Sequence, residues 1–529
     1  MADAVATPNR RRTREILQFV TKRPAAALLR SRRDGYDASR DGTEITQPEV
    51  RMALGRRNEE RQAEFWVATR RLPSCPGHVF YQKLNGLLSE AGFDEWIETI
   101  CEPYYAKAGR PGIPPGVYFR MLLVGYFEGI GSQRGIAWRC SDSLSIRKFL
   151  GVPATEESPD HSSLSVIRER LPAEVHRAAF AWVLKMAREK NLLNGKTIGV
   201  DSTPLEANAA MKSIVRRDTG EDWQEYVTGL MRESGTIGPQ ETPTIEELKR
   251  FDKSRSGKKV SNDDWESPID PDSRITKMKD GTTHLAYKAE HAVDLNTSLI
   301  VAAEIYHADQ GDAQTLEDTV HMAQTNLREC GSDVQVEDVA ADKGYHAAAT
   351  LAAIAECTPY RTYIPEPRLK AGQKRKWTDK PLEQRDATYV NRRRSRGVRG
   401  RRLQRLRSER VERTFAHVCE TGGARRTWLW GIDKVQKRYV IAAMAHNLGC
   451  IMRELFGMGT PRGLQKAAEA LVTLLCALHL ALIALWRFPK SQTITVPRIS
   501  RVRAIPRSGC VRLGGWRRDH GNTSFSTGC

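Results

Sequence analysis

The order of strand-like and helix-like runs between residues 196 and 364 is the feature that most constrains the fold. Two helix-like runs, 312–329 and 346–356, separate strand-like runs of apolar and β-branched residues. The strand-like runs are 196–201, 285–293, 298–305, 335–341 and 360–364. The second and third flank Asp294–Asn296 and predict a hairpin. The resulting order, strand, hairpin, helix, strand, helix, strand, predicts a mixed α/β sheet.

Helical patterns precede this region. Apolar residues recur at spacings of three and four along 79–92, 114–128, 132–150 and 161–190. Asp160 and Ser162 are suited to cap the helix that follows them. Short helices joined by tight turns fit a helix-turn-helix-like DNA-binding unit and fit a plain helical bundle equally well.

The remaining segments complete a four-part organisation. Residues 1–70 are expected to be a basic, disordered arm, 76–190 a helical DNA-binding domain, and 196–457 an α/β domain. Within the last, 205–283 is expected to be a polar insertion or long loop, 366–402 a basic stretch that breaks the pattern, and 403–420 and 432–457 helices. Residues 458–529 are expected to form a helix at 464–487 and a basic, disordered tail.

Charge indicates the partner. The chain has 83 Lys and Arg residues against 64 Asp and Glu, a net charge of +19. Such a surplus favours a polyanion such as nucleic acid, because neutralising phosphates releases counterions. A solvated basic surface without a partner is the alternative.

Cysteines and apolar segments indicate the compartment. The ten cysteines form no C-x-x-C pair and no Cys/His group with zinc spacing, which predicts reduced thiols. Arg10–Arg14 is not followed by the apolar core of a secretory signal. Residues 470–486 carry no full charge, yet 17 residues is short for a membrane span, so a buried or oligomerising helix is expected. We therefore expect a cytoplasmic protein with no membrane partner.

Three carboxylates stand out by position. Asp201 is expected to close the first strand and Asp342 the fourth, and Glu412 lies on the helix after an arginine-rich run. Phosphodiester cleavage with two metal ions needs acidic ligands that converge from different elements. Taken singly, such residues are more commonly caps or solvated side chains. The three together, in basic surroundings, predict a site for divalent cations.

Several motifs, in order along residues 76–457, resemble bacterial insertion-sequence transposases with a DDE catalytic domain of the RNase H-like fold. PDHSSLSVIRERL (159–171) is similar to the end of that family's helical region, and IGVDSTPLEANA (198–209) to its first-Asp motif. The others are DPDSR (270–274), AYKAEHAVD (286–294), DKGY (342–345), VERTF (411–415) and AHNL (445–448).

The resemblance implies the chemistry. Asp201, Asp342 and Glu412 would be the catalytic ligands of two Mg²⁺ or Mn²⁺ ions. The reaction would be hydrolysis at the terminal inverted repeats of an element, followed by attack of the freed 3′-OH on target DNA. The family also implies a nucleoid-associated homodimer or higher assembly on paired double-stranded DNA ends.

The match departs around the glutamate. Many relatives carry Tyr, Arg and Lys at seven before, four before and seven after it, where this chain has Arg405, Ser408 and Cys419. Glu409 competes with Glu412 for the third-ligand position. A metal nuclease without strand transfer and a catalytically decayed DNA-binding protein therefore stay open as alternatives.

Basic and aromatic residues complete the predictions. The residues expected to contact phosphates, with a solvated basic loop as the alternative, are Arg392, Arg393, Arg394, Arg401, Arg402, Arg405 and Lys343. Trp428 and Trp430 are expected in the core, with stacking on a nucleotide as the alternative. Four histidines, His284, His291, His307 and His346, are expected to be structural.

Overall fold

The computed structural model describes residues 74–463 except 107–111, 257–260, 279–280, 370–376 and 379. It also describes residues 68, 72, 475–476 and 478–480. Apart from these few, the predicted arm at 1–70, helix at 464–487 and C-terminal tail lie outside the described residues. Within the described part, no helix is both long and apolar enough to span a membrane.

The predicted mixed sheet is confirmed. Its strands are β1 (Thr197–Glu206), β4 (Arg274–Lys277), β5 (Thr283–Asp294), β6 (Ile300–His307), β7 (Asp338–Ala341) and β8 (Arg361–Tyr363). β1 lies between β5, which is antiparallel to it, and β7, which is parallel, and β8 continues the parallel side. On its other side β5 pairs with β4 and β6, both antiparallel. The predicted hairpin is the β5–β6 pair.

One predicted strand end is wrong. β1 continues five residues past Asp201, because residues up to Glu206 pair with β5 as far as Ala286. The polar residues and Pro204 in this second half hid the strand pattern. β7, by contrast, ends at Ala341, so Asp342 follows its strand as predicted.

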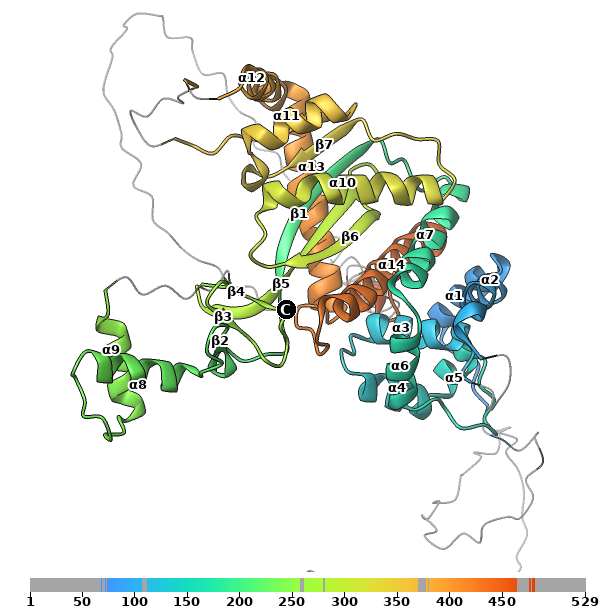
Figure 1. Ribbon diagram of the computed structural model, residues 1–529. Helices are drawn as coiled ribbons and strands as arrows, with labels where there is room; N and C mark the ends of the chain where they lie inside the picture. The colour runs from blue at the N-terminus through green and yellow to red at the C-terminus, as the bar shows by residue number, and fades with distance from the viewer. Residues whose placement is uncertain are drawn as a thin grey trace, which may run out of the picture. The chain divides into compact units, whose positions relative to one another are not determined.

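Helices cover both faces of the sheet (Figure 1). Along β1, Gly199 lies against α13 (Val398–Phe415). Ser202, three residues further on, is hydrogen-bonded to Asp312 of α10 (Asp312–Glu329). Successive residues of a strand point to opposite faces, so α13 and α10 lie on opposite sides of β1.

A third helix, α14 (Ile432–Phe456), completes the edge of the sheet. The amides of Gln436 and Asn447 on α14 bond to backbone N–H and C=O groups of β6, at Ile305, Ala303 and Ile300. These bonds satisfy strand groups that would otherwise be unpaired.

The N-terminal part is helical as predicted, but with more breaks. Its helices are α1 (Val79–Glu90), α2 (Phe93–Cys101), α3 (Pro115–Glu128), α4 (Gln133–Asp142), α5 (Leu144–Leu150), α6 (His161–Arg170) and α7 (Ala173–Glu189). Ser143 caps α5 and divides the predicted 132–150 helix, and Pro172 divides the predicted 161–190 helix. Asp160 caps α6 as expected, whereas α2 was not predicted.

Two segments expected to be irregular are folded. The insertion contains β2 (Val215–Arg216), α8 (Trp223–Glu233), α9 (Ile245–Ser254) and β3 (Trp265–Glu266). The two helices bury a small core of Val227, Met231 and Leu248, so this segment is not a long loop. In the arginine-rich stretch, α12 (Leu382–Arg396) precedes α13, which begins before the predicted residue 403. α11 (Ala348–Cys357) matches its prediction closely.

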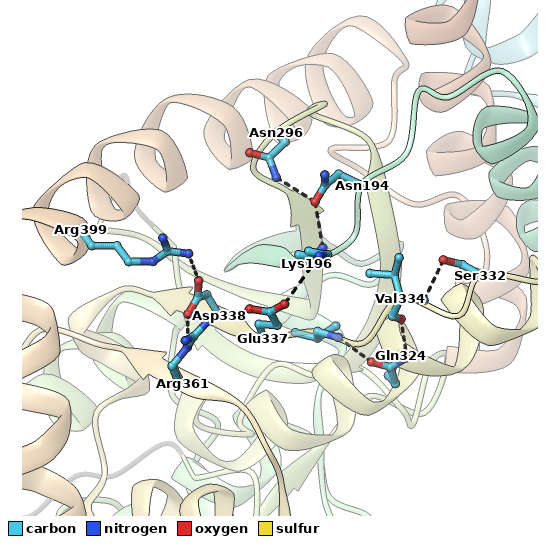
Figure 2. Close-up of polar contacts among 11 residues, drawn as sticks. Asn194, Lys196, Asn296, Gln324, Ser332, Val334, Glu337, Asp338, Arg361 and Arg399 are labelled. Carbon is cyan, nitrogen blue, oxygen red and sulfur yellow. Dashed lines mark hydrogen bonds and ion pairs between the residues drawn. The ribbon is translucent and has the colours of Figure 1, made fainter.

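A buried carboxylate anchors the start of α13. Asp338, at the amino end of β7, has no exposed surface and accepts hydrogen bonds from Arg361 at 2.8 Å and from Arg399. Figure 2 shows Asp338 between these two guanidinium groups. Arg399 therefore holds the helix that carries Glu412 to the sheet.

Candidate active site

Asp201 and Asp342 lie side by side on neighbouring strands. The parallel register of β1 and β7 pairs Val200 with Ala341, and each aspartate is the next residue of its chain. Neighbouring strands are spaced about 4.8 Å apart. The predicted convergence of these two carboxylates is therefore present in the fold.

The pKa of Asp201 shows the electrostatic strain of this arrangement. Burial raises its pKa, and the nearby negative charge of Asp342 raises it further. Arg407 opposes both effects, because its Nη1 donates to Asp201 Oδ2 at 2.6 Å. The other oxygen of Asp201 accepts the N–H of Ser202 at 2.9 Å, and Asp342 Oδ1 accepts the N–H of Gly344 at 2.6 Å.

Close packing brings α13 to Asp201. Gly199 has no side chain, and a Cβ built there would lie 3.0 Å from Val411 Cγ2 and 3.2 Å from Arg407 Cγ. In the same interface, His291 of β5 lies opposite Asp201 of β1. Its Nδ1 is hydrogen-bonded to Thr414 Oγ1, and its ring stacks on that of Phe415 with the centroids 4.1 Å apart. The helix therefore has little freedom to shift relative to the strand.

Glu412 lies five residues after Arg407 and one turn after Ser408 on α13, and it is exposed. Its Oε1 accepts a hydrogen bond from Ser408 Oγ at 3.0 Å. Across the described residues, no hydrogen bond or ion pair joins Glu412 to either aspartate. Its competitor Glu409 is exposed and pairs with Arg413 at 3.0 Å. The fold thus brings two of the three predicted ligands together, whereas Glu412 is on the helix that packs against β1 and contacts neither aspartate in the described residues.

Behind β1 lies a buried charged network that the sequence analysis missed. Asp312, the first residue of α10, accepts from Ser202 Oγ at 2.9 Å and from Lys288 Nζ at 3.0 Å. Lys288 also lies 3.4 Å from Glu290, which is fully buried. Burial raises the pKa of Glu290, while Lys288 and a hydrogen bond from Thr315 lower it.

This network also reaches the second aspartate. A Cβ built on Gly344 would lie 2.7 Å from Asp312 Oδ2 and 3.0 Å from Asp342 Oδ1. The two carboxylates therefore flank one glycine, and glycine at this position allows their close approach. The sequence signal for Asp312 was its place at the start of a well-predicted helix.

The predicted phosphate-binding residues divide by exposure. Arg393, Arg401, Arg402, Arg405 and Lys343 are exposed, and Arg394 is half-buried. Arg392 instead bonds to Glu366 at 2.7 Å and lies over the Tyr389 ring, which is a structural arrangement. Two arginines closer to the aspartates were missed: Arg407, and Arg425, whose Nη1 donates to Thr203 Oγ1 at 2.9 Å. Thr203 is on the same face of β1 as Asp201.

Two aromatic predictions are wrong, and one histidine prediction holds clearly. Trp428 and Trp430 are 51% and 52% exposed, so neither is a core residue.

His291 is fully buried, and burial holds its pKa well below the ordinary value. Its Nε2 accepts from the hydroxyl of Tyr439 at 2.8 Å.

The donor set fits a divalent cation in part. Asp201 and Asp342 offer hard oxygen ligands whose mutual repulsion a cation would relieve. Among the described residues, no three acidic, histidine or cysteine side chains form a ready-made metal cluster. A third ligand therefore has to come from a side chain that turns toward the pair, and Glu412 is exposed and free of any ion pair in the described residues.

The sheet order is β6-β5-β1-β7-β8, antiparallel on one side of β1 and parallel on the other, with Asp201 on β1 and Asp342 directly after β7. This arrangement defines a class of mixed α/β domain with an acidic pair at its centre. Comparison with known families specifies it. Residues 70–170 match the family described as a transposase domain (DUF772), and residues 255–448 match the transposase DDE domain. No curated protein and no solved structure matches the chain.

The chain is therefore an insertion-sequence transposase with an RNase H-like α/β domain, as the motifs predicted. The family acts on DNA and generally uses divalent metal ions.

Proposed function

We propose that this transposase cleaves DNA at the inverted repeats of its element and joins the freed 3′-OH to target DNA. The helical region 76–190 would bind the ends, and the region 196–457 would carry out the chemistry. The observation that supports this best is that Asp201 and Asp342 directly follow the paired residues Val200 and Ala341 of adjacent parallel strands, where the two carboxylates repel each other.

In this proposal Asp201, Asp342 and Glu412 hold two divalent ions, Mg²⁺ or Mn²⁺. Ions bound there would activate the attacking oxygen and stabilise the leaving one. Glu412 would join the aspartates when its side chain leaves Ser408, while α13 stays packed on Gly199.

The protein's own cations have distinct roles. Arg407 neutralises Asp201 until DNA and metal arrive and then offers its guanidinium to the phosphate. The exposed arginines of α13, Arg401, Arg402 and Arg405, hold the DNA backbone on the same helix as Glu412. Two copies of the chain would assemble on paired ends.

The test is cleavage and joining of an end-labelled duplex that carries the flanking repeats, with Mg²⁺ or Mn²⁺. The variants are Asp201→Asn, Asp342→Asn and Glu412→Gln. Glu409→Gln is the matched control, because it lies three residues away on the same helix and pairs only with Arg413. We expect each of the first three to lose cleavage by at least a hundredfold while retaining DNA binding, and the control to cleave normally.

Other outcomes separate the alternatives. Cleavage by the wild type without a joined product identifies a metal nuclease. DNA binding without any metal-dependent cleavage identifies a decayed enzyme, in which Ser408 and Cys419 replace charged residues of the family pattern. Loss of cleavage in Glu409→Gln but not in Glu412→Gln would mean that the third ligand is Glu409.

A further inference from the structure

A cavity of about 300 Å³ lies away from the aspartates, between the N-terminal helices and α14. Its walls come from α3, the loop 130–132, α4, α6, α14 and the segment 422–429. The lining is largely apolar, with Leu122, Ile130, Leu429 and Ile441 among its residues. This volume is at the lower end for small-ligand pockets and is suited to one nucleotide rather than to a duplex.

The charged groups of this cavity are all basic. Four cationic side chains, Arg134, Arg168, Lys437 and Arg438, line it, and its lining includes no aspartate or glutamate. Lys437 is paired with Asp433 at 2.6 Å. In the described residues, no carboxylate forms an ion pair with the three arginines.

The arginines are placed at some electrostatic cost. Arg168 is 6% exposed. Arg438 donates to the backbone carbonyls of Gly423 and Arg426 at 3.0 and 3.4 Å. Burial, together with the like charge of Arg168, lowers the pKa of Arg438 to about 10. Arg134 is exposed, whereas Arg168 is buried and Arg438 is half-buried. Neighbouring like charges without a carboxylate partner in the described residues favour binding of an anion.

An aromatic side chain lies at the same cavity. Trp428 lines it and is half exposed, and its Nε1 lies 3.1 Å from where a Cβ on Gly131 would be. Arg426 lies over the Trp428 ring at 5.2 Å, so it keeps the indole oriented. A tryptophan can stack on a base, and neighbouring arginines can bind the phosphate of the same nucleotide.

We propose that this cavity binds a single nucleotide, with its phosphate at Arg134, Arg168 and Arg438 and its base against Trp428 and the apolar wall. Two sources share this chemistry: an unpaired nucleotide of the DNA substrate, or a free mononucleotide. The first source rests on the proposed function, and the second does not.

The experiment compares the affinity of the full-length protein for two labelled duplexes, one fully paired and one with a single unpaired 3′ deoxyadenosine. We expect the wild type to prefer the second about tenfold, as stacking of one base allows. Trp428→Ala and Arg134→Gln should abolish this preference.

Matched controls come from the same segments. Trp430→Ala removes an equally exposed tryptophan that does not line the cavity, and Arg139→Gln removes an arginine of α4 that pairs instead with Glu128. Both should keep the wild-type preference. Equal preference in the wild type and Trp428→Ala overturns the proposal.

A second arm separates the sources. Deoxyadenosine monophosphate is tested as a competitor and by its effect on the melting temperature of the wild type, Trp428→Ala and Trp430→Ala. Competition and stabilisation that depend on Trp428 identify a free nucleotide as the ligand, and a duplex preference without them identifies the DNA strand. If neither duplex binds, the proposed function fails, and the melting temperature alone tests whether the cavity binds a nucleotide. If deoxyadenosine monophosphate then gives no stabilisation that depends on Trp428, the proposed nucleotide site is overturned as well.

Discussion

Replacing Gly199 by alanine tests whether the spacing between β1 and α13 sets the geometry of the catalytic carboxylates. Gly199 lies two residues before Asp201, in extended backbone that alanine adopts without strain. The new methyl would lie 2.6 Å from Leu295 Cδ2 and 3.0 Å from Val411 Cγ2. Because both distances are shorter than carbon–carbon contacts of about 3.5–4.0 Å, the Leu295 side chain has to turn away, and α13 has to give way slightly at Val411.

The magnitude follows from these contacts. Overpacking a well-packed interface costs about 1–3 kcal/mol of unfolding free energy. The short contact at Val411 implies a displacement of a few tenths of an ångström at that residue. Misplacement by about 1 Å can lower the rate of catalysis about a hundredfold. We therefore expect Gly199→Ala to lose up to about a hundredfold in DNA cleavage with only moderate destabilisation.

The assay pairs cleavage of the end-labelled duplex with urea unfolding. Gly86→Ala is the control, because nothing lies within 4 Å of a Cβ at Gly86, which is inside α1. Alanine should stabilise that helix by about 0.5–1 kcal/mol and leave cleavage unchanged. If Gly199→Ala is destabilised as expected but cleaves at the wild-type rate, the spacing between β1 and α13 does not control the active site, and the reasoning is refuted.

Three further predictions concern charged groups. Arg407→Met should lower the unfolding free energy by about 1–3 kcal/mol without divalent ions, because Asp201 loses its counterion. For the same reason Mg²⁺ should stabilise this variant more than the wild type, and equal stabilisation would contradict the prediction. Lys288→Met should cost about 3–5 kcal/mol in urea unfolding by leaving Glu290 buried without its cation, and adding Glu290→Gln should recover part of that loss. Burial lowers the pKa of His176 to about 4, so the imidazole is protonated in the unfolded chain before it is protonated in the folded one. The unfolding free energy should therefore fall by about 3 kcal/mol as the pH drops from 6.5 to 4. His176→Asn should flatten this decline when unfolding is measured across that range.

Local pattern was sufficient for most elements of the catalytic half. The α10 prediction matches the observed residues Asp312–Glu329, because a long amphipathic run is read from side-chain periodicity alone. β1 was cut short because its second half depends on pairing with β5, a partner some eighty residues away. α12 was missed because a polar, arginine-rich run has no apolar stripe, and its burial against β8 is a tertiary effect.

The site shows the same division. The motifs predicted Asp201 and Asp342 as candidate metal ligands. The parallel register of β1 and β7 is what places these two residues next to each other. Arg407 was not singled out from the other arginines of its run. Only the packing of α13 over Gly199 brings it to Asp201.

The sequence by itself determined the type of protein, because the order of strands and helices and the acidic motifs are properties of neighbouring residues along the chain. The tertiary structure decided which charges meet. It joined Arg407 to Asp201 and buried Lys288 with Glu290. It also placed at the Trp428 cavity three arginines that form no ion pair within the described part of the chain. Charge interactions depend on distance and burial in space, and spacing along a sequence does not specify either.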